Sequence, residues 1–272
     1  MKSALLKSFV LMSMILAGVE MAAQRSVMVH SHNDYRQSRP FWNAYTHHAA
    51  SIEADVYLVD GVFLVGHDRE ELSGDRTLEK MYIEPLVKVF GRNGGKAWKE
   101  SDCRLQLMVE LKAGTVPELD SLRALLSRWP EVFDPSVNEN AVRVVVTGRV
   151  PAPENFAEYP DFISFDGSFS QEYTEEQMER VALMSANFAD FSRWKGTGQI
   201  SASEYERLME AVRYAHENGK PVRFWNAPEN ETVYKTFSGM GIDYINSDRP
   251  EVSGKFAGKC ARGIHVETKT RL

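Results

Sequence analysis

Short apolar runs recur along the chain at the length of a buried strand, and amphipathic or polar segments of helix length separate most of them. Buried strands that alternate with helices are typical of a parallel sheet whose faces are covered. We therefore predict an α/β protein, and the number of strands matches a (β/α)8 TIM barrel. The predicted strands span residues 27–29, 51–58, 105–112, 142–147, 162–166, 182–186, 222–225 and 243–246.

Helix signals lie between these strands. Thr77 is a plausible N-cap for the second helix, which we expect to end at Gly91, and Gly219 follows the long fourth helix. Only a short helix fits between residues 166 and 182, so we predict an irregular barrel. The predicted helices span residues 41–50, 78–90, 118–129, 203–218 and 231–238.

Ionisable side chains interrupt the first two apolar runs at a spacing of two residues. His30 and His32 end the first run, and Glu53 and Asp55 lie within the second. Residues two apart in a strand point to the same face, so each pair is expected to face one way. A buried carboxylate without a partner is unstable, and a metal ion or a basic group is the usual remedy. The pattern predicts a functional site at one end of these strands.

Two further features bring charged groups to the same place. Asp60-Gly61 is a hairpin turn signal between the apolar residues 56–58 and 62–65, and the returning strand carries His67 back beside the carboxylates. Glu110 and Lys112 repeat the two-residue spacing near the end of the next strand. We expect these groups to join the site.

The first 23 residues have the pattern of a secretory signal peptide. Lys2 and Lys7 accompany an apolar run at residues 9–19, and Met21-Ala22-Ala23 offers a small-residue cleavage site. The run is too short to span a bilayer stably. Removing 23 of the 272 residues leaves 249, which is a typical length for a single TIM-barrel domain. We expect that domain at residues 24–272, in a periplasmic or secreted protein.

Composition narrows the possible partners. A formal net charge of −6 argues against nucleic acid as the main partner, and no apolar stretch after the predicted signal peptide could cross a membrane. The chain has two cysteines, Cys103 and Cys260, and their positions in the sequence leave open whether they form a disulfide. The oligomeric state is not determined by the sequence either.

Six motifs follow one another in the chain: HSHNDY, SIEADV, VGHD, VELK, RFWNAPE and INSDRP. Their order resembles the superfamily of glycerophosphodiester phosphodiesterases and phosphatidylinositol phospholipases C. Within it, the motifs look most like the branch named after altered inheritance of mitochondria protein 6. The resemblance extends from residue 27 to residue 250, which makes it far more specific than any single motif.

The resemblance implies a phosphodiesterase with one divalent cation, Ca²⁺ or Mg²⁺, and two histidines as general base and acid. Carried over by position, Glu53, Asp55 and Glu110 would be the metal ligands. His67 would be one catalytic histidine, and Lys112 would contact the phosphate. Carboxylate oxygens are suitable ligands for both ions, and imidazole titrates at about pH 6.5, where it can give or take a proton.

The second histidine and the substrate contacts depart from the family pattern. This chain has HSHND where glycerophosphodiesterases have His-Arg-Gly, so Asn33 replaces the family's arginine. The spacing to Pro40 favours His32 as the equivalent histidine, whereas the position directly after the strand favours His30. Trp225 and Asn33 are candidate substrate contacts. A glycerophosphodiester, a phospholipid head group or a similar phosphodiester would all suit the site.

Other interpretations remain open at this stage. Asp248 could form a structural ion pair with Arg249 that closes the barrel. The protein could be a catalytically silent barrel that binds a phosphorylated or carbohydrate ligand. An HxH motif also begins metal-dependent amidohydrolases, but those need further histidines after the middle strands. Only His216 and His265 follow His67 here, so we consider that class less favourable.

Overall fold

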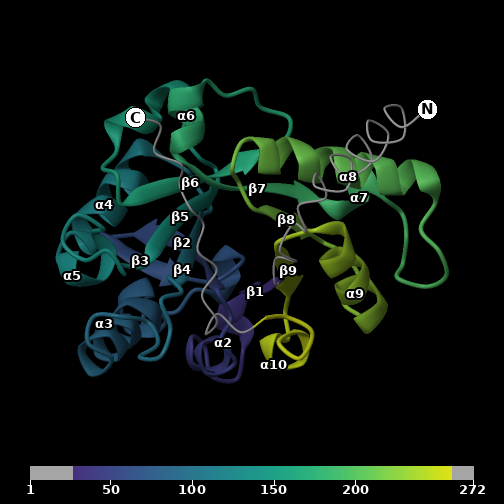
Figure 1. Ribbon diagram of the computed structural model, residues 1–272. Coiled ribbons are helices and arrows are strands. Elements are labelled where there is room, and N and C mark those ends of the chain that lie inside the picture. Colours follow the sequence, from purple (N-terminus) through teal and green to yellow (C-terminus); the bar gives the residue numbers. More distant parts are fainter. Residues whose placement is uncertain (1–26, 259–272) are drawn as a thin grey trace, which may run out of the picture.

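The computed structural model describes residues 27–258. Eight parallel strands form a closed barrel in the order β1-β2-β4-β5-β6-β7-β8-β9, and β9 pairs with β1 to close it (Figure 1). Strand β3 pairs antiparallel with the end of β2. The strands are β1 (Met28–Ser31), β2 (Ser51–Val59), β3 (Val62–Val65), β4 (Gln106–Leu111), β5 (Arg143–Gly148), β6 (Ile163–Ser168), β7 (Val181–Asn187), β8 (Val222–Trp225) and β9 (Tyr244–Ser247). The predicted (β/α)8 barrel is confirmed.

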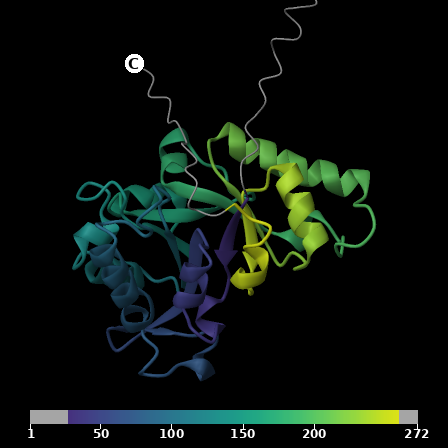
Figure 2. The same ribbon diagram turned by 60° about the horizontal axis from the view of Figure 1, so that its bottom comes forward.

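The helices cover the outside of the barrel unevenly. A 3₁₀ segment, Pro153–Glu158, is the only helical element between β5 and β6 within the described residues 27–258, and a five-residue helix follows β6. Figures 1 and 2 both place the long helix α8 outside the strands, beside β7 and β8. The irregularity expected between residues 166 and 182 is thus observed. The α-helices are α2 (Trp42–Thr46), α3 (Glu84–Arg92), α4 (Val116–Leu126), α5 (Pro130–Phe133), α6 (Glu175–Glu179), α7 (Phe188–Phe191), α8 (Ala202–Glu217), α9 (Glu231–Met240) and α10 (Pro250–Ser253).

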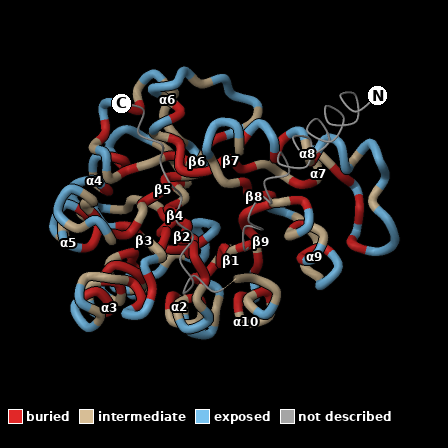
Figure 3. The backbone as a smooth tube through the Cα atoms, in the orientation of Figure 1, coloured by how far each residue is buried: buried red, intermediate tan, exposed pale blue. Residues whose placement is uncertain are grey.

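The strands form the buried centre of the molecule (Figure 3). The first six residues of β2 are all buried, and so are the three central valines of β5. The apolar side chains of the strands and the inner faces of the helices join in one large core cluster. Because apolar burial favours folding by about 25 cal/mol per Å², this pattern explains why continuous apolar runs marked the strands.

The second predicted helix differs from the expectation. A π-helical turn, Glu79–Ile83, comes first, and α3 then continues through Gly91 to Arg92. Pro85 supplies the physical reason for the irregular start, because proline has no N–H to bond back to the preceding turn. Thr77 still caps this segment, since its hydroxyl accepts a hydrogen bond from the Lys80 N–H at 3.2 Å.

Several predictions concern residues that the structure does not describe. The expected signal peptide at residues 1–23, together with Cys260 and His265, lies outside the described range. The signal peptide and the export that it implies therefore stay predictions from the sequence, and the pairing of Cys103 with Cys260 stays open. Among residues 27–258, no helix is long and apolar enough to cross a membrane.

The loop after β1 is fixed by a buried carboxylate. Asp34 is fully buried and accepts hydrogen bonds from the Ser31 hydroxyl, the Phe41 N–H and the Tyr82 hydroxyl. Burial raises the pKa of Asp34 to about 6. The three donors hold the carboxyl end of β1 in place, and this end carries His30 and His32.

Candidate active site

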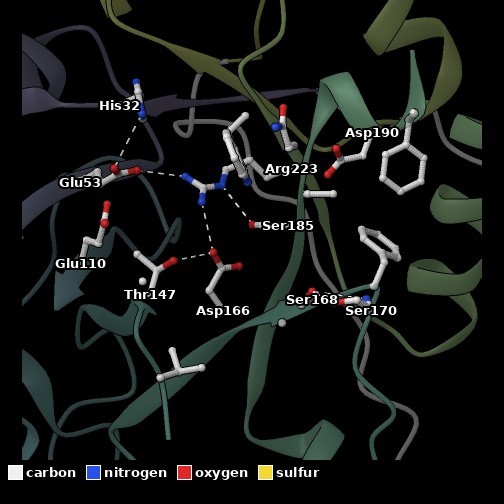
Figure 4. A pocket seen from close by; sticks show the side chains of 18 of the residues that line it. His32, Glu53, Glu110, Thr147, Asp166, Ser168, Ser170, Ser185, Asp190 and Arg223 are labelled. Carbon is white, nitrogen blue, oxygen red and sulfur yellow. Dashed lines mark hydrogen bonds and ion pairs between the residues drawn. The ribbon is translucent and has the colours of Figure 1, made fainter. Parts of the chain in front are cut away.

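A cleft of about 760 Å³ opens at the carboxyl ends of the barrel strands (Figure 4). Its lining comes from β2, from β4 to β8, from α7 and from the loops after β5 and β6, together with His32 after β1 and His67 after β3. Parallel barrels place the ends of all their strands on one face, so side chains that are distant in sequence meet there. At one end of this cleft, the structure brings together the ionisable residues that the sequence singled out.

Three carboxylates form the centre of that end. Glu53 and Asp55 lie on β2, Glu110 lies on β4 opposite Asp55, and one oxygen from each lies within 4.8 Å of the others. Oδ1 of Asp55 is buried and has no hydrogen-bond partner among the described residues. A buried carboxylate oxygen without a donor is rare and needs an explanation. A hard divalent cation would satisfy it, because such ions prefer carboxylate oxygens. The three residues therefore fit a metal ion.

Lys112 compensates part of this negative charge. Its Nζ lies 2.7 Å from Oδ2 of Asp55 and 2.8 Å from Oε1 of Glu110. Burial alone would lower the pKa of Lys112, but its hydrogen bonds to the two carboxylates raise it above the usual value. Lys112 therefore remains a cation at neutral pH.

His32 contacts the cleft with one ring nitrogen and a carboxylate with the other. Nδ1 lies 2.7 Å from Oδ1 of Asp248, and Nε2 lies 3.9 Å from Oε1 of Glu53. Burial opposes the charged imidazole, but the hydrogen bond to Asp248 and the charge of Glu53 raise the pKa of His32. A carboxylate at Nδ1 keeps the proton there, so Nε2, which lies 3.3 Å from the side-chain nitrogen of Asn33, is the ring nitrogen that can accept a proton from a substrate. Asp248 therefore binds a candidate catalytic histidine, and this observation replaces the structural ion pair with Arg249 that the sequence left open.

His30 is fully buried beneath the carboxylates. The Gln106 amide donates to the Ser51 hydroxyl at 2.9 Å, and Ser51 lies 2.7 Å from Nδ1 of His30. Nε2 lies 2.6 Å from Oε2 of Glu53. Nη1 of Arg223 also lies 2.7 Å from Nε2 of His30. Burial and the charge of Arg223 lower the pKa of His30 to about 4, so it is neutral at pH 7. Its contacts suit it to orient Glu53 rather than to exchange protons with a substrate.

His67 approaches the carboxylates from the loop after β3. Its Nδ1 lies 3.0 Å from Oδ2 of Asp55, and its side chain is 46% exposed. The Glu71 carboxylate accepts from the His67 N–H at 2.9 Å, and the Tyr57 hydroxyl donates to the His67 carbonyl at 3.0 Å. These contacts hold the backbone of His67 at the cleft. The hairpin therefore returns this histidine to the carboxylates, as we predicted.

The two predicted substrate contacts differ in position. Trp225 lines the cleft at the end of β8 and is 40% exposed. Asn33 is not a lining residue; it lies beside the ring of His32, and its side-chain oxygen accepts from the Tyr35 hydroxyl at 2.6 Å. Asn33 is therefore placed to orient His32.

Sequence reasoning missed Arg223, a buried cation on β8. Its guanidinium donates to Oε2 of Glu53 at 3.0 Å, to Oδ2 of Asp166 at 3.1 Å and to the Ser185 hydroxyl at 3.1 Å. Thr147 donates to the same oxygen of Asp166 at 2.9 Å (Figure 4). An arginine inside an apolar strand was the available signal, because a buried guanidinium requires a carboxylate partner.

The charges of the whole cluster do not balance without an added cation. Four carboxylates face two fixed cations, and His30 is neutral, so two negative charges remain. Burial raises the pKa of Glu110, with a contribution from the nearby Asp55, and burial also raises the pKa of Asp166. The charged groups counted are Glu53, Asp55, Glu110, Asp166, Lys112 and Arg223.

Gly148 provides a local test of the carboxylate geometry. Its φ is +79°, and a Cβ atom there would lie 2.7 Å from Cγ of Glu110. We expect Gly148→Ala to displace Glu110 and to weaken metal binding by about 10-fold to 100-fold, comparable to the loss of an orienting contact. Titration of Ca²⁺ or Mg²⁺ by calorimetry measures the change.

Gly91→Ala is the matched control. Gly91 lies in α3, has no heavy atom within 4 Å of an added Cβ and has no positive φ. This variant should bind metal like the unaltered protein and should be slightly more stable. An unaltered dissociation constant in Gly148→Ala would contradict the proposed role of Glu110.

Comparison with known proteins identifies the family. Residues 21–154 match the model of the AIM6-like phosphodiesterase domain. Altered inheritance of mitochondria protein 6 of Saccharomyces cerevisiae strain YJM789 is 41% identical over 266 residues, which cover 81% of this chain and 68% of the relative. The chain belongs to the AIM6-like family. The protein of that name from Eremothecium gossypii is 27% identical over 267 residues, covering 84% of this chain and 69% of the relative.

Solved structures share the fold of this AIM6-like protein. A glycerophosphodiester phosphodiesterase from Parabacteroides distasonis superposes with a TM-score of 0.54 at 17% identity, covering 85% of this chain and 95% of that one. A calcium-dependent phosphoinositol-specific phospholipase C from a Pseudomonas species gives 0.54 at 12% identity, covering 84% and 90%. At these identities the similarity establishes the barrel, and the chemistry has to be argued from the site.

Proposed function

We propose that this AIM6-like protein is an exported, metal-dependent phosphodiesterase. One observation carries the proposal: His32 and His67, from two separate loops, both reach the three-carboxylate group at the mouth of the barrel. Phosphodiester cleavage requires charge neutralisation at the phosphate, a base for the attacking hydroxyl and an acid for the leaving alkoxide. The carboxylates, His32 and His67 at this end of the cleft are suited to these three tasks. The export part rests on the pattern of residues 1–23 alone.

The proposed mechanism assigns a task to each group. Glu53, Asp55 and Glu110 would hold the cation, which when bound supplies positive charge to the phosphate oxygens. Nε2 of His32 takes the proton from the attacking hydroxyl, which belongs to water or to the substrate itself. His67 donates a proton to the leaving alkoxide. Lys112 provides a second cation for the phosphate.

Asp248 sets the pH at which His32 can act as a base. Its carboxylate stabilises the imidazolium and so raises the pKa of His32, which means that the base is lost as the pH falls through this raised value. Asp248→Asn should lower this pKa and move the low-pH limb of the kcat profile to lower pH. Asp161→Asn, at a side chain that is 98% exposed, is the control and should leave the profile in place. If the low-pH limb of the kcat profile stayed in place in Asp248→Asn, the assignment of His32 as the base would be wrong.

The alternative enzyme class gains no support from His216, the one histidine that follows His67 within residues 27–258. His216 lies on α8, and its Nε2 contacts Asp243, the residue before β9, at 2.8 Å. It therefore lies near the amino end of a strand, whereas the carboxylates lie at the carboxyl ends. A catalytically silent barrel remains the second candidate, and turnover distinguishes it from the phosphodiesterase.

The direct test is a panel of phosphodiesters followed by phosphorus NMR. The purified protein is incubated with a glycerophosphodiester, a phospholipid and a nitrophenyl phosphodiester, with and without Mg²⁺ or Ca²⁺. We expect metal-dependent cleavage to phosphomonoesters or to a cyclic phosphate, and the spectrum distinguishes the two routes. No turnover of any phosphodiester with either ion would reject the proposal in favour of a silent barrel.

A further inference from the structure

The cleft continues well beyond the three carboxylates, toward the ends of β6, β7 and β8. We call this part the distal cleft and define it by six of its lining residues, Ser168, Phe169, Ser170, Asp190, Phe191 and Trp225. The phosphate would lie at the opposite end, beside Glu53 and Glu110. The distal cleft must therefore receive one of the organic groups that the phosphate joins.

Asp190 is the charged group of the distal cleft. Figure 4 shows its carboxylate directed into the cleft, on the side away from Glu53 and Glu110. None of the residues 27–258 forms a hydrogen bond or ion pair with this carboxylate. Arg223 is the one lysine or arginine in the described lining, and its guanidinium already binds Glu53 and Asp166. Asp190 is thus an exposed carboxylate that has no counter-ion among residues 27–258 and faces the substrate space.

Three aromatic residues, Phe169, Phe191 and Trp225, line the distal cleft together with Asp190. Phe169 and Phe191 meet edge to face with their ring centroids 5.9 Å apart, and Trp225 exposes 40% of its surface. Aromatic faces next to a carboxylate are the chemical environment that binds organic ammonium groups, through the ring quadrupole and the opposite charge. A second phosphate would be repelled by Asp190. A neutral group would cover that carboxylate without supplying a counter-charge.

The charge of the whole cleft favours the same ligand. Its lining carries four carboxylates and one arginine within the part of the chain that the structure describes, and the chain has a formal net charge of −6. A substrate with an additional negative charge would enter against this potential. A zwitterionic phosphodiester matches it, because its phosphate lies at the metal end and its ammonium group lies at Asp190.

We infer that the distal cleft selects phosphodiesters that carry an ammonium group, with Asp190 as the specificity-determining residue and Trp225 as its aromatic partner. This inference rests on the proposed phosphodiesterase function. It adds the charge of the substrate's organic group, which neither the family match nor the fold determines.

A matched pair of substrates tests the inference. The nitrophenyl phosphodiester of choline and that of 3,3-dimethylbutanol share their leaving group and differ only by nitrogen in place of carbon, so they differ in charge and hardly in shape. We expect kcat/KM to favour the choline ester by about tenfold or more, as a charge pair and a cation–π contact at a partly exposed site would provide. In Asp190→Asn this ratio should fall to near one.

Three further variants complete the design. Asp120→Asn, at an exposed carboxylate on α4 that pairs with Arg123, should keep the full ratio. Trp225→Leu should reduce the ratio, and Trp225→Phe should retain most of it. An equal rate for both esters in the unaltered protein would overturn the inference, and so would an unchanged ratio in Asp190→Asn.

Binding measurements separate this inference from the proposed activity. Calorimetry with choline and with 3,3-dimethyl-1-butanol requires no turnover. If neither ester is cleaved but choline binds more tightly in an Asp190-dependent way, the phosphodiesterase proposal fails and the ammonium site stands. If both ligands bind equally or neither binds, the ammonium site is rejected whether or not the esters are cleaved.

Discussion

Chelation should abolish phosphodiester cleavage by this protein, and Mg²⁺ or Ca²⁺ should restore it better than Zn²⁺. The proposed ligands offer only carboxylate oxygens, which Mg²⁺ and Ca²⁺ prefer, whereas zinc sites commonly use imidazole or thiolate. These ligands are Glu53, Asp55 and Glu110. The four carboxylates and two cations of the cluster also leave two negative charges, which one divalent ion would neutralise. Activity after exhaustive chelation, with metal-free protein shown by elemental analysis, would disprove the site.

Glu53→Gln tests the same site without relying on turnover. The hydrogen bond with His30 and the charge of Arg223 hold the pKa of Glu53 below its usual value despite burial, so the residue is an ionised ligand at neutral pH. We expect the variant to weaken Mg²⁺ or Ca²⁺ binding by at least about tenfold, measured by calorimetry. Glu206→Gln, at a side chain that is 70% exposed on α8, is the matched control. Equal affinities in the two variants would place the ion elsewhere.

His32→Ala should lower kcat by about 10²-fold or more and should remove the low-pH limb of the profile, because it removes the proposed base. His30→Ala should differ in kind. His30 is buried and bonded to Glu53, so its loss should weaken metal binding and leave the low-pH limb present. If His30→Ala removed that limb and His32→Ala did not, the two assignments would have to be exchanged.

His67→Ala should remove the opposite limb, because the protonated imidazole is the proposed acid. Its loss should be about 10²-fold or more with an alkyl leaving group. Nitrophenolate needs little protonation as it departs, so a nitrophenyl ester should recover much of the lost rate in this variant. The measurement is kcat for the two esters across pH. Equal losses with good and poor leaving groups would show that His67 is not the acid.

The sequence predicted the parts of the site whose geometry is local. Residues two apart in a strand share a face whatever the rest of the chain does, so Glu53 with Asp55 and Glu110 with Lys112 could be paired in advance. The Asp60-Gly61 turn likewise fixed the return of His67 within a few residues. Strands such as β2, β4 and β5 were predictable because each is an apolar run that is mostly buried on both faces.

The positions of the two histidines at the end of β1 could be predicted only in part from the local sequence. His30 and His32 both reach Glu53, as their spacing indicated, but from different depths: His30 at 2.6 Å inside the barrel and His32 at 3.9 Å from the cleft. His32 lies beyond the last residue of β1, next to Asn33 at a φ of +47°. The alternation of a strand no longer applies there, so no periodicity could choose between the two histidines.

By itself, the sequence determined the alternating strands and helices, the order of the motifs and the chemical type of each group at the metal end, because these depend on short-range periodicity and on residue identity. Only the tertiary structure decided which groups touch. Asp248 binds His32 across 216 residues of sequence, and Arg223 binds Glu53 across 170. Such contacts exist only after the barrel closes and brings the ends of all its strands to one face, and no local pattern encodes that closure. The same closure places Asp190 and Trp225 in the cleft that contains the carboxylates.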